Sequence, residues 1–346
     1  MEKIVYILGA GFSAYAGVPL MNNFILKAKD IYYNGESKYA YFGKIFSKID
    51  ELAKVKNFFK ADLYNIEEVL SLFDTEAILY RNTKFKSEFI RFISDTIEYY
   101  TFKSLGINLG MANWETSFLG KDTPSKYAFF ALSLMGTSFT TSKTGNVSKG
   151  DLILQRVKNE NYSYSVISLN YDLLLENCIK CINDYYEPQV HLEFEKEKYL
   201  KEWGTPHLCK LHGSIDTKNI IPPTWSKNTS SDSIQKTWKN AYNTLKDATQ
   251  IRIIGYSLPI TDNNVRFLLK SAMLKNESLK KIDVICLDKT GKIKSIYDEF
   301  IDFNYYEFKN EKIETYLSPA GNLKKSSNQI SLNNLEKLHR NFMDQS

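Results

Sequence analysis

The chain begins with a glycine-rich turn, YILGAGFSAYAGVP at residues 6–19, that could hold a phosphate. Gly9, Gly11 and Ala14 have the spacing G-x-G-x-x-G/A directly after an apolar run and at the start of a helical pattern. Glycines at such a turn let the backbone approach a pyrophosphate, and the helix N-terminus offers N–H groups to it. The same spacing also occurs in plain turns, so the motif alone leaves both interpretations open.

An ordinary dehydrogenase would also carry an acidic residue about 20 positions after the glycines, at the end of a second strand. Asp30 has that spacing, but it lies in a segment whose pattern predicts a helix. The sequence therefore argues against a dehydrogenase.

Two later stretches place polar side chains at predicted strand ends. In SLNYDLLLE, Asn170 and Asp172 follow a buried strand and precede a helix, where ligands bind in open α/β sheets. In KLHGSID, His212 lies in an apolar run that ends at Gly213. Each residue also has a structural interpretation, because Asp172 could cap the helix and His212 could be a hydrogen-bonded core histidine.

A third stretch, IIGYSLPITD, has Gly255 and Ser257 at the tip of another strand-like run. Both residues could simply turn the chain. Asp288 ends a further apolar run, VICLD. These positions gain meaning only in combination with the earlier ones.

The elements that must position these residues are strands covered on both faces. Four apolar runs, KIVYILG, YSVISLN, QIRIIGYS and KIDVICLD, are typical of a parallel sheet. We predict the class α/β, with a Rossmann-like doubly wound parallel sheet and a helical insertion lobe.

The predicted lobe spans about 34–161, where the apolar pattern has a period close to 3.6. Asn65 followed by Glu68 has the spacing of a capping box at the start of one helix. Four apolar side chains fall on one face of that helix: Ile66, Val69, Leu70 and Phe73. We expect loops at 140–151 and 318–329, the second before a last short helix.

Taken in this order, GAGFSAYAGVP, SLNYD, KLHGSI and GYSLP resemble the Sir2 (sirtuin-like) superfamily of NAD-consuming proteins. The resemblance covers roughly residues 1–33 and 162–300. It implies a discontinuous NAD-binding domain, 1–33 with 162–317, interrupted by the lobe at 34–161 and followed by a C-terminal loop and short helix at 318–346.

The resemblance also implies a role for each site residue. The residues that line the phosphate and ribose site of NAD would be Gly9, Ala10, Gly11 and Ser13. Asn170 and Asp172 would hold the ribose on the nicotinamide side, and His212 would be the catalytic base. The residues on the adenosine half would be Gly255 and Ser257, with Asp288 near the adenine ribose.

The sequence lacks two features of the protein-deacylating branch of the superfamily, which argues against a deacylase. Deacylating sirtuins typically carry two CxxC pairs that bind zinc, whereas the four cysteines here are scattered: Cys178, Cys181, Cys209 and Cys286. Such scattered thiolates would not easily meet as a tetrahedral site, so we expect no metal. The sirtuin P-x-F-R is also missing after Pro19.

NYDLLLE, NIEEVLSLFD and GYSLPITDNNVRFLL instead look like the Sir2-like NADases of bacterial anti-phage defence. This resemblance implies a zinc-free NAD⁺ hydrolase that releases nicotinamide and ADP-ribose in abortive infection. Two alternatives stay open: an NAD-dependent protein deacylase, and a non-catalytic sensor of NAD or ADP-ribose.

Composition limits the partners. The net charge is +5 over 346 residues, with lysines interleaved with glutamates, so we expect no direct nucleic-acid binding. No apolar stretch approaches the roughly 20 residues of a membrane span, and the cysteine usage predicts a reducing cytoplasm. We expect His191, His207 and His339 to be surface or loop residues.

An NAD hydrolase that is always active, at an enzyme rate of about 10 per second, would deplete the NAD pool of its own cell, so its activity must be gated. The sheet and insertion use nearly all of the chain. We therefore expect a homo-oligomer that is switched on by a partner protein or a phage component.

Overall fold

The computed structural model describes most of the chain, in the ranges 1–54, 62–81, 84–105, 123–140, 153–156, 161–186, 191–197, 205–221, 232–317, 329–330 and 335–344. The loops predicted at 140–151 and 318–329 lie outside these residues, apart from one residue of each. No described helix is long and apolar enough to span a membrane.

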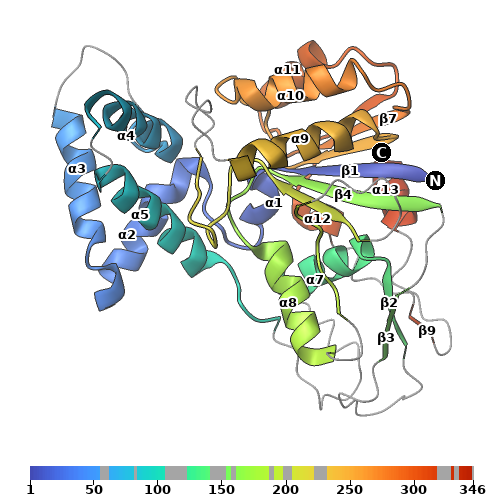
Figure 1. Ribbon diagram of the computed structural model, residues 1–346, viewed down its shortest axis with the longest axis horizontal. Helices are drawn as coiled ribbons and strands as arrows, with labels where there is room; N and C mark the ends of the chain where they lie inside the picture. Colours follow the sequence, from blue (N-terminus) through green and yellow to red (C-terminus); the bar gives the residue numbers. More distant parts are fainter. Residues whose placement is uncertain are drawn as a thin grey trace.

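Six parallel strands form the main sheet, in the order β5-β4-β1-β6-β7-β8 (Figure 1). Numbered by their place along the chain within this sheet, the strands run 3-2-1-4-5-6, which is the doubly wound Rossmann order. This confirms the predicted fold class. The strands are β1 (Glu2–Leu8), β4 (Tyr162–Ser168), β5 (His207–Lys210), β6 (Gln250–Ile254), β7 (Lys281–Ile285) and β8 (Tyr306–Lys309).

The sheet is buried on both faces because its strands alternate between two hydrophobic cores. In β1, Tyr6 and Leu8 enter one core, whereas Val5 and Ile7 enter the other. The first core includes α1 (Ala10–Ala14), α7 (Thr123–Leu134), α8 (Leu174–Tyr186), α12 (Ile313–Leu317) and α13 (Leu335–Met343). The second includes α9 (Asp232–Lys246), α10 (Asn263–Met273) and α11 (Lys292–Phe300).

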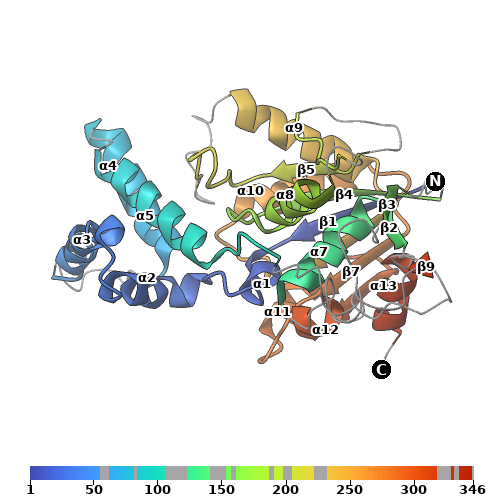
Figure 2. The ribbon, with the colours of Figure 1, turned by 90° about the horizontal axis from the view of Figure 1, so that it is seen from below.

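A lobe of helices lies beyond the carboxyl ends of the strands, at the opposite end of the molecule from the amino terminus (Figure 2). Aromatic rings join its helices, since Phe42 lies 4.6 Å from Phe92 and Phe24 lies 6.0 Å from Phe92, between ring centroids. The lobe consists of α2 (Phe24–Tyr33), α3 (Phe42–Lys54), α4 (Ile66–Tyr80) and α5 (Lys84–Tyr100), with short 3-10 turns at Met21–Asn23 and Ser37–Tyr39.

The predicted start of α4 is confirmed at its N-cap. The Asn65 side chain accepts hydrogen bonds from the backbone N–H groups of Glu67 (3.0 Å) and Glu68 (3.3 Å). The apolar face predicted for this helix is buried. The cap therefore fixes where α4 begins, at the edge of the lobe that faces the sheet.

The stretch 34–161 holds more than the predicted helices. Its helix α7 packs on the sheet, where the Tyr127 hydroxyl donates to the carbonyl of Phe12 and Phe130 contacts Tyr6 edge to face. A small antiparallel sheet follows, in the order β3-β2-β9, from β2 (Thr137–Thr140), β3 (Ile153–Arg156) and β9 (Gln329–Ile330). Strands of four residues or fewer are too short for an alternating pattern to stand out in the sequence.

Polar side chains cross the middle of the main sheet on one face. Tyr6, Arg252 and Asp283 are in register on β1, β6 and β7. Arg252 is 1% exposed and Asp283 is also 1% exposed, which is unusual because charged groups are rarely buried without partners. Strand residues supply some of their partners, since Arg252 donates to the hydroxyl of Tyr6 and Lys281 pairs with Asp283, and the C-terminal helix supplies the others.

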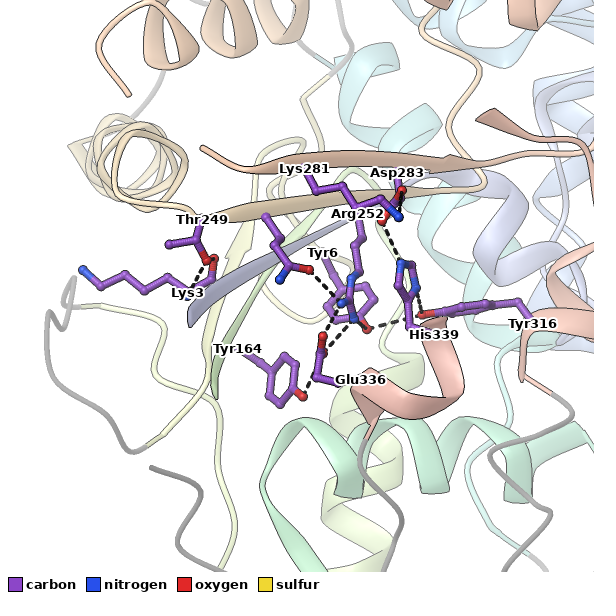
Figure 3. Close-up of polar contacts among 11 residues, drawn as sticks. Lys3, Tyr6, Tyr164, Thr249, Arg252, Lys281, Asp283, Tyr316, Glu336 and His339 are labelled. Atoms are coloured by element: carbon purple, nitrogen blue, oxygen red, sulfur yellow. Dashed lines mark hydrogen bonds and ion pairs between the residues drawn. The ribbon is translucent and has the colours of Figure 1, made fainter. Parts of the chain in front are cut away.

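Helix α13 supplies these partners (Figure 3). Glu336 accepts hydrogen bonds from Arg252, at 2.9 Å for one pair, and from the hydroxyl of Tyr164 at 3.0 Å. His339 Nε2 lies 2.9 Å from Asp283 Oδ2, and its Nδ1 lies 3.1 Å from the Tyr316 hydroxyl. Helix α13 thus supplies the carboxylate that pairs with Arg252 and the histidine that hydrogen-bonds to Asp283, while Lys281 of β7 lies 3.1 Å from the other carboxylate oxygen of Asp283.

The prediction that three histidines lie at the surface is correct for His191 but wrong for the other two. His207 lies in β5 and is 4% exposed, and His339 is 3% exposed. Burial lowers the pKa of His339, although Asp283 acts in the opposite direction, so its neutral form is favoured at neutral pH. The burial of His339 could not be predicted from the sequence, because its partner Asp283 is 56 positions away along the chain.

Replacing Glu336 with alanine should lower the free energy of unfolding by about 3–5 kcal/mol, because it leaves the Arg252 guanidinium buried without its carboxylate. Urea denaturation followed by circular dichroism measures this change. The control is Glu307→Ala, which breaks a half-exposed contact with Lys281 and should cost at most about 1 kcal/mol. Equal losses in the two variants would contradict this account of α13.

Candidate active site

A cavity of about 500 Å³ lies at the carboxyl edge of the sheet, between the strand-end turns and the helical lobe. This volume is within the range of about 300–1,000 Å³ usual for small-molecule and cofactor sites. The position is where the strand order reverses between β1 and β6, which is the usual ligand site of doubly wound sheets.

Two backbone turns meet on the sheet side of this cavity. The N–H of Gly9 donates to the carbonyl of Ile254 at 2.9 Å, and the N–H of Gly11 donates to the carbonyl of Gly255 at 2.8 Å. A Cβ atom on Gly9 would lie 2.5 Å from the Cα of Tyr256. Such a distance is impossible, so glycine is needed for the β1–α1 turn to pack against the β6–α10 turn.

Gly255 is required for a second reason. Its φ of +67° lies in the left-handed region, and a Cβ there would lie 2.3 Å from the backbone nitrogen of Phe12. The glycines of the two motifs therefore allow the two turns to pack against each other. The cavity lies beside this contact.

Asn170 ties the strand end of β4 to the glycine turn. Its Nδ2 donates to the carbonyl of Gly9 and to the hydroxyl of Ser13, both at 2.9 Å. Both amide hydrogens are thereby used within the protein, while Oδ1 accepts no hydrogen bond from the described residues. The side chain thus lines the cavity with a fixed orientation and an unused acceptor.

Asp172 lies in the same wall and has structural partners. Its Oδ1 accepts from the backbone N–H of Leu174 at 3.1 Å, a turn bond two residues along the chain at the start of α8. Burial raises the pKa of Asp172, although the positive Lys210 and a hydrogen bond from Ser13 act in the opposite direction. Lys210 also donates to the backbone carbonyl of Asp172.

His212 reaches the cavity from the turn after β5 and is 4% exposed. Its Nε2 lies 3.2 Å from Oδ2 of Asp262, and the hydroxyl of Tyr256 donates to the same oxygen at 2.9 Å. Its Nδ1 has no hydrogen-bond partner among the described residues. One nitrogen is therefore held by the protein, and the other is available to a ligand.

Sequence reasoning missed Asp262 and Tyr256, although both lie in the stretch IIGYSLPITD. An aspartate just before a helical pattern is usually read as an N-cap, and a tyrosine in an apolar run as core. Only the packing of this loop against the end of β5 brings the two side chains to the histidine.

The opposite wall comes from the lobe and from the segment that leads into it. It is mostly apolar, with Val18, Pro19, Leu20, Met21, Phe24, Ile66, Leu70, Ile93 and Ile97. Glu67, which sequence reasoning also missed, is the acidic exception on this wall. The lobe side of the cavity is thus largely apolar, whereas the sheet side carries most of the polar groups beside apolar residues such as Leu169, Leu287 and Ile293.

Most of the predicted site residues meet at this cavity. Those that line it are Ala10, Gly11, Ser13, Asn170, Asp172, His212, Gly255 and Ser257. Gly9 lies behind the lining, in the contact between the turns. Asp288 does not line it, because its carboxylate accepts from the N–H groups of Lys294 (2.9 Å) and Thr290 (3.2 Å). The Lys294 bond is the main cause that lowers the pKa of Asp288.

The cysteines lie in separate elements. Cys178 and Cys181 are in α8, Cys209 is in β5 and Cys286 follows β7. Burial raises the pKa of the Cys286 thiol to about 12. Among the described residues, no group of three or more histidine, cysteine or acidic side chains gathers as metal ligands would.

Residues 164–315 match the family model described as a SIR2-like domain. Such a domain implies an activity related to NAD. The match includes Asn170, His212 and Asp262, and it leaves out the glycine turn at the amino terminus. No curated protein matches the chain.

The chain is also similar to solved sirtuin structures. Sir2 in complex with an inhibitor, 2'-O-acetyl-ADP-ribose and a deacetylated peptide is 12% identical, with a TM-score of 0.34. Sir2 bound to an acetylated peptide is 13% identical, with a TM-score of 0.38. In both cases the similarity covers 92% of this chain and 91% of the other. These values are too low to transfer a substrate or a mechanism.

Replacing Gly9 with alanine should lower the free energy of unfolding by about 1–3 kcal/mol, because the new methyl group collides with the backbone of Tyr256. Chemical denaturation measures the change. The control is Gly43→Ala in α3, where the new methyl would meet only the end of the Tyr32 side chain and helix propensity gains up to about 1 kcal/mol. If Gly9→Ala were as stable as the control, the close contact between the turns would be refuted.

Proposed function

We propose that this protein is an NAD⁺ glycohydrolase, which cleaves NAD⁺ to nicotinamide and ADP-ribose. The observation that carries the proposal is the meeting of Asn170 and His212 at one cavity, beside two glycine turns at the carboxyl edge of a doubly wound sheet. The SIR2-like domain and the resemblance of the ordered motifs support NAD as the substrate.

NAD⁺ would lie along the polar wall of the cavity. Ala10, Gly11 and Ser13 would contact the phosphates and a ribose, while Gly255 and Ser257 would contact the adenosine half. The N–H of Gly11 already donates to Gly255, so other backbone atoms of the turn would have to meet the phosphates. The predicted role of Asp288 at the adenine ribose stays a prediction.

The residue types suit cleavage of the nicotinamide glycosidic bond. This bond breaks through a state in which the ribose carries positive charge, and nicotinamide leaves as a neutral molecule, so no strong general acid is needed. The unused Oδ1 of Asn170 can accept a hydrogen bond from a ribose hydroxyl or from the attacking water. A fixed amide of this kind positions the reacting groups without competing for the proton.

The step balances with water as the only co-reactant. The water oxygen bonds to the anomeric carbon of the ribose as the bond from that carbon to nicotinamide breaks, and the nicotinamide nitrogen keeps the electron pair. His212 takes one proton from the water and later releases it to solvent, as a general base does. The second hydrogen of the water stays on the new anomeric hydroxyl.

The same account includes a role in anti-phage defence, with activity gated by assembly. The resemblance of NYDLLLE, NIEEVLSLFD and GYSLPITDNNVRFLL to defence NADases supports this role. The apolar wall that the lobe presents to the cavity gives gating a physical means, because a shift of the lobe would change access to the site. A homo-oligomer with a partner protein or a phage component would set that arrangement.

Purified protein incubated with NAD⁺ should yield nicotinamide and ADP-ribose in equal amounts, measured by chromatography. His212→Ala and Asn170→Ala should each lower turnover by about 100-fold or more, with an unchanged circular dichroism spectrum. His191→Ala is the control, because that histidine is exposed and should leave turnover unchanged. A chelator should also have no effect.

The products separate the alternatives. Transfer of an acyl group from an acylated peptide to ADP-ribose would identify a deacylase instead, and intact NAD⁺ under every condition would identify a sensor. If His212→Ala cleaved NAD⁺ as fast as the wild type at neutral pH, His212 would not be the catalytic base.

Gating predicts that the purified protein is slow when dilute and faster when concentrated, and that cells expressing it lose NAD⁺ only on infection. Turnover measured across protein concentrations, and NAD⁺ measured in infected and uninfected cells, check this. Rapid cleavage by a dilute monomer, with no change on infection, would rule out both the gating and the defence role.

A further inference from the structure

Asp262 stands at the N-cap position of α10 but does not cap the helix. Aspartate is among the best N-cap residues, since its side chain normally accepts from the first free N–H groups. Here the side chain makes no such bond, and it is 2% exposed. Its Oδ2 lies 3.2 Å from Nε2 of His212. The Asp262 side chain thus contacts the cavity histidine instead of capping the helix.

The loop before α10, which carries Asp262, has a strained backbone that surrounding contacts hold in place. Leu258 has a φ of +51°, which costs a residue with a side chain about 1–2 kcal/mol, yet its side chain is fully buried. Its carbonyl accepts from Arg266 at 3.0 Å, and the carbonyl of Tyr256 accepts from Tyr297 at 2.8 Å. Strain of this kind persists only where the surroundings hold it, and it is common at functional sites.

The hydrogen bonds assign a proton to one nitrogen of the ring. The Tyr256 hydroxyl donates to Oδ2 of Asp262, and burial, assisted by the Asp262 charge, raises the pKa of Tyr256 and keeps this hydroxyl protonated. The carboxylate is therefore an acceptor from both sides, so Nε2 of His212 must carry hydrogen. A neutral imidazole has only one N–H, which leaves the lone pair on Nδ1.

We propose that Asp262 is a positioning residue, which holds the Nε2–H tautomer of His212 and so makes Nδ1 the atom that accepts the proton. The consequence for cleavage rests on the proposed NAD⁺ hydrolysis. As the ring takes its proton, the positive charge forms 3.2 Å from a buried carboxylate, which stabilises it. Asp262 acts only through the histidine.

The protein contains a matched pair outside the cavity. His339 Nε2 lies 2.9 Å from Asp283 Oδ2, and both side chains are buried on one face of the sheet. The variant Asp283→Asn therefore removes a buried carboxylate from a histidine without touching the candidate site. It separates a general loss of stability from a specific effect on His212.

The first test reads the tautomer directly and needs no substrate. Long-range ¹H–¹⁵N NMR of protein labelled in its histidine rings, with the His212 signals assigned by their loss in His212→Ala, should show a protonated Nε2 and an unprotonated Nδ1. In Asp262→Asn, the amide can offer a hydrogen to Nε2, so the proton should move wholly or partly to Nδ1. In Asp283→Asn the His212 signals should not change. A wild-type ring protonated on Nδ1 overturns the proposal.

The second test is kinetic. Asp262→Asn should lower kcat by about 10²–10⁴-fold with KM changed by less than about threefold, because the base is lost while the binding wall is kept. Asp283→Asn should keep kcat within about twofold while lowering the melting temperature.

The outcomes separate the two proposals. If Asp262→Asn cleaves NAD⁺ as fast as the wild type does, the positioning role is refuted, but the proposed NAD⁺ hydrolase activity is not. Absence of cleavage by the wild type would refute the proposed function, and the ring signals would still decide the tautomer. If Asp262→Asn does not fold, the wild-type spectrum decides alone.

Discussion

The site depends on a close backbone contact between two turns. The β1–α1 and β6–α10 turns approach through glycine at both sides, and the N–H groups of Gly9 and Gly11 donate across the junction. No larger side chain fits at Gly9 or Gly255. Asn170 then bonds to the carbonyl of Gly9, so the third element of the cavity wall is fixed to the same junction.

The sequence predicted those parts whose cause is local. Runs of buried apolar residues indicated four of the six strands of the main sheet, glycines marked the turns that end two of them, and Asn65 marked the start of α4. The parallel, doubly wound class of the sheet also followed from these runs, because strands buried on both faces are typical of such sheets. Most of the predicted site residues line the cavity, since the carboxyl ends of parallel strands meet at one edge.

The parts that sequence reasoning missed depend on contacts between distant segments. Arg252 lies in the middle of an apolar run, and its carboxylate comes from Glu336, 84 positions away. His212 and Asp262 are 50 positions apart, and the aspartate resembles an ordinary helix cap. Nothing within either stretch signals the pairing, because it is created by the fold.

The two walls of the cavity give a physical basis for the proposed chemistry. The sheet wall offers fixed polar groups, and the lobe wall is largely apolar, so a bound substrate would be screened from bulk water while being held by few, oriented hydrogen bonds. Fixed groups in a site of low polarity stabilise developing charge more than the same groups in water do.

The most direct test of this account is a crystal structure of the His212→Ala variant with NAD⁺. We expect NAD⁺ in the cavity, with the ribose that carries nicotinamide at Oδ1 of Asn170, the anomeric carbon facing the space left by the imidazole, and the adenosine half towards Ser257. NAD⁺ bound outside this cavity, or bound with its adenine end at Asn170, would contradict it.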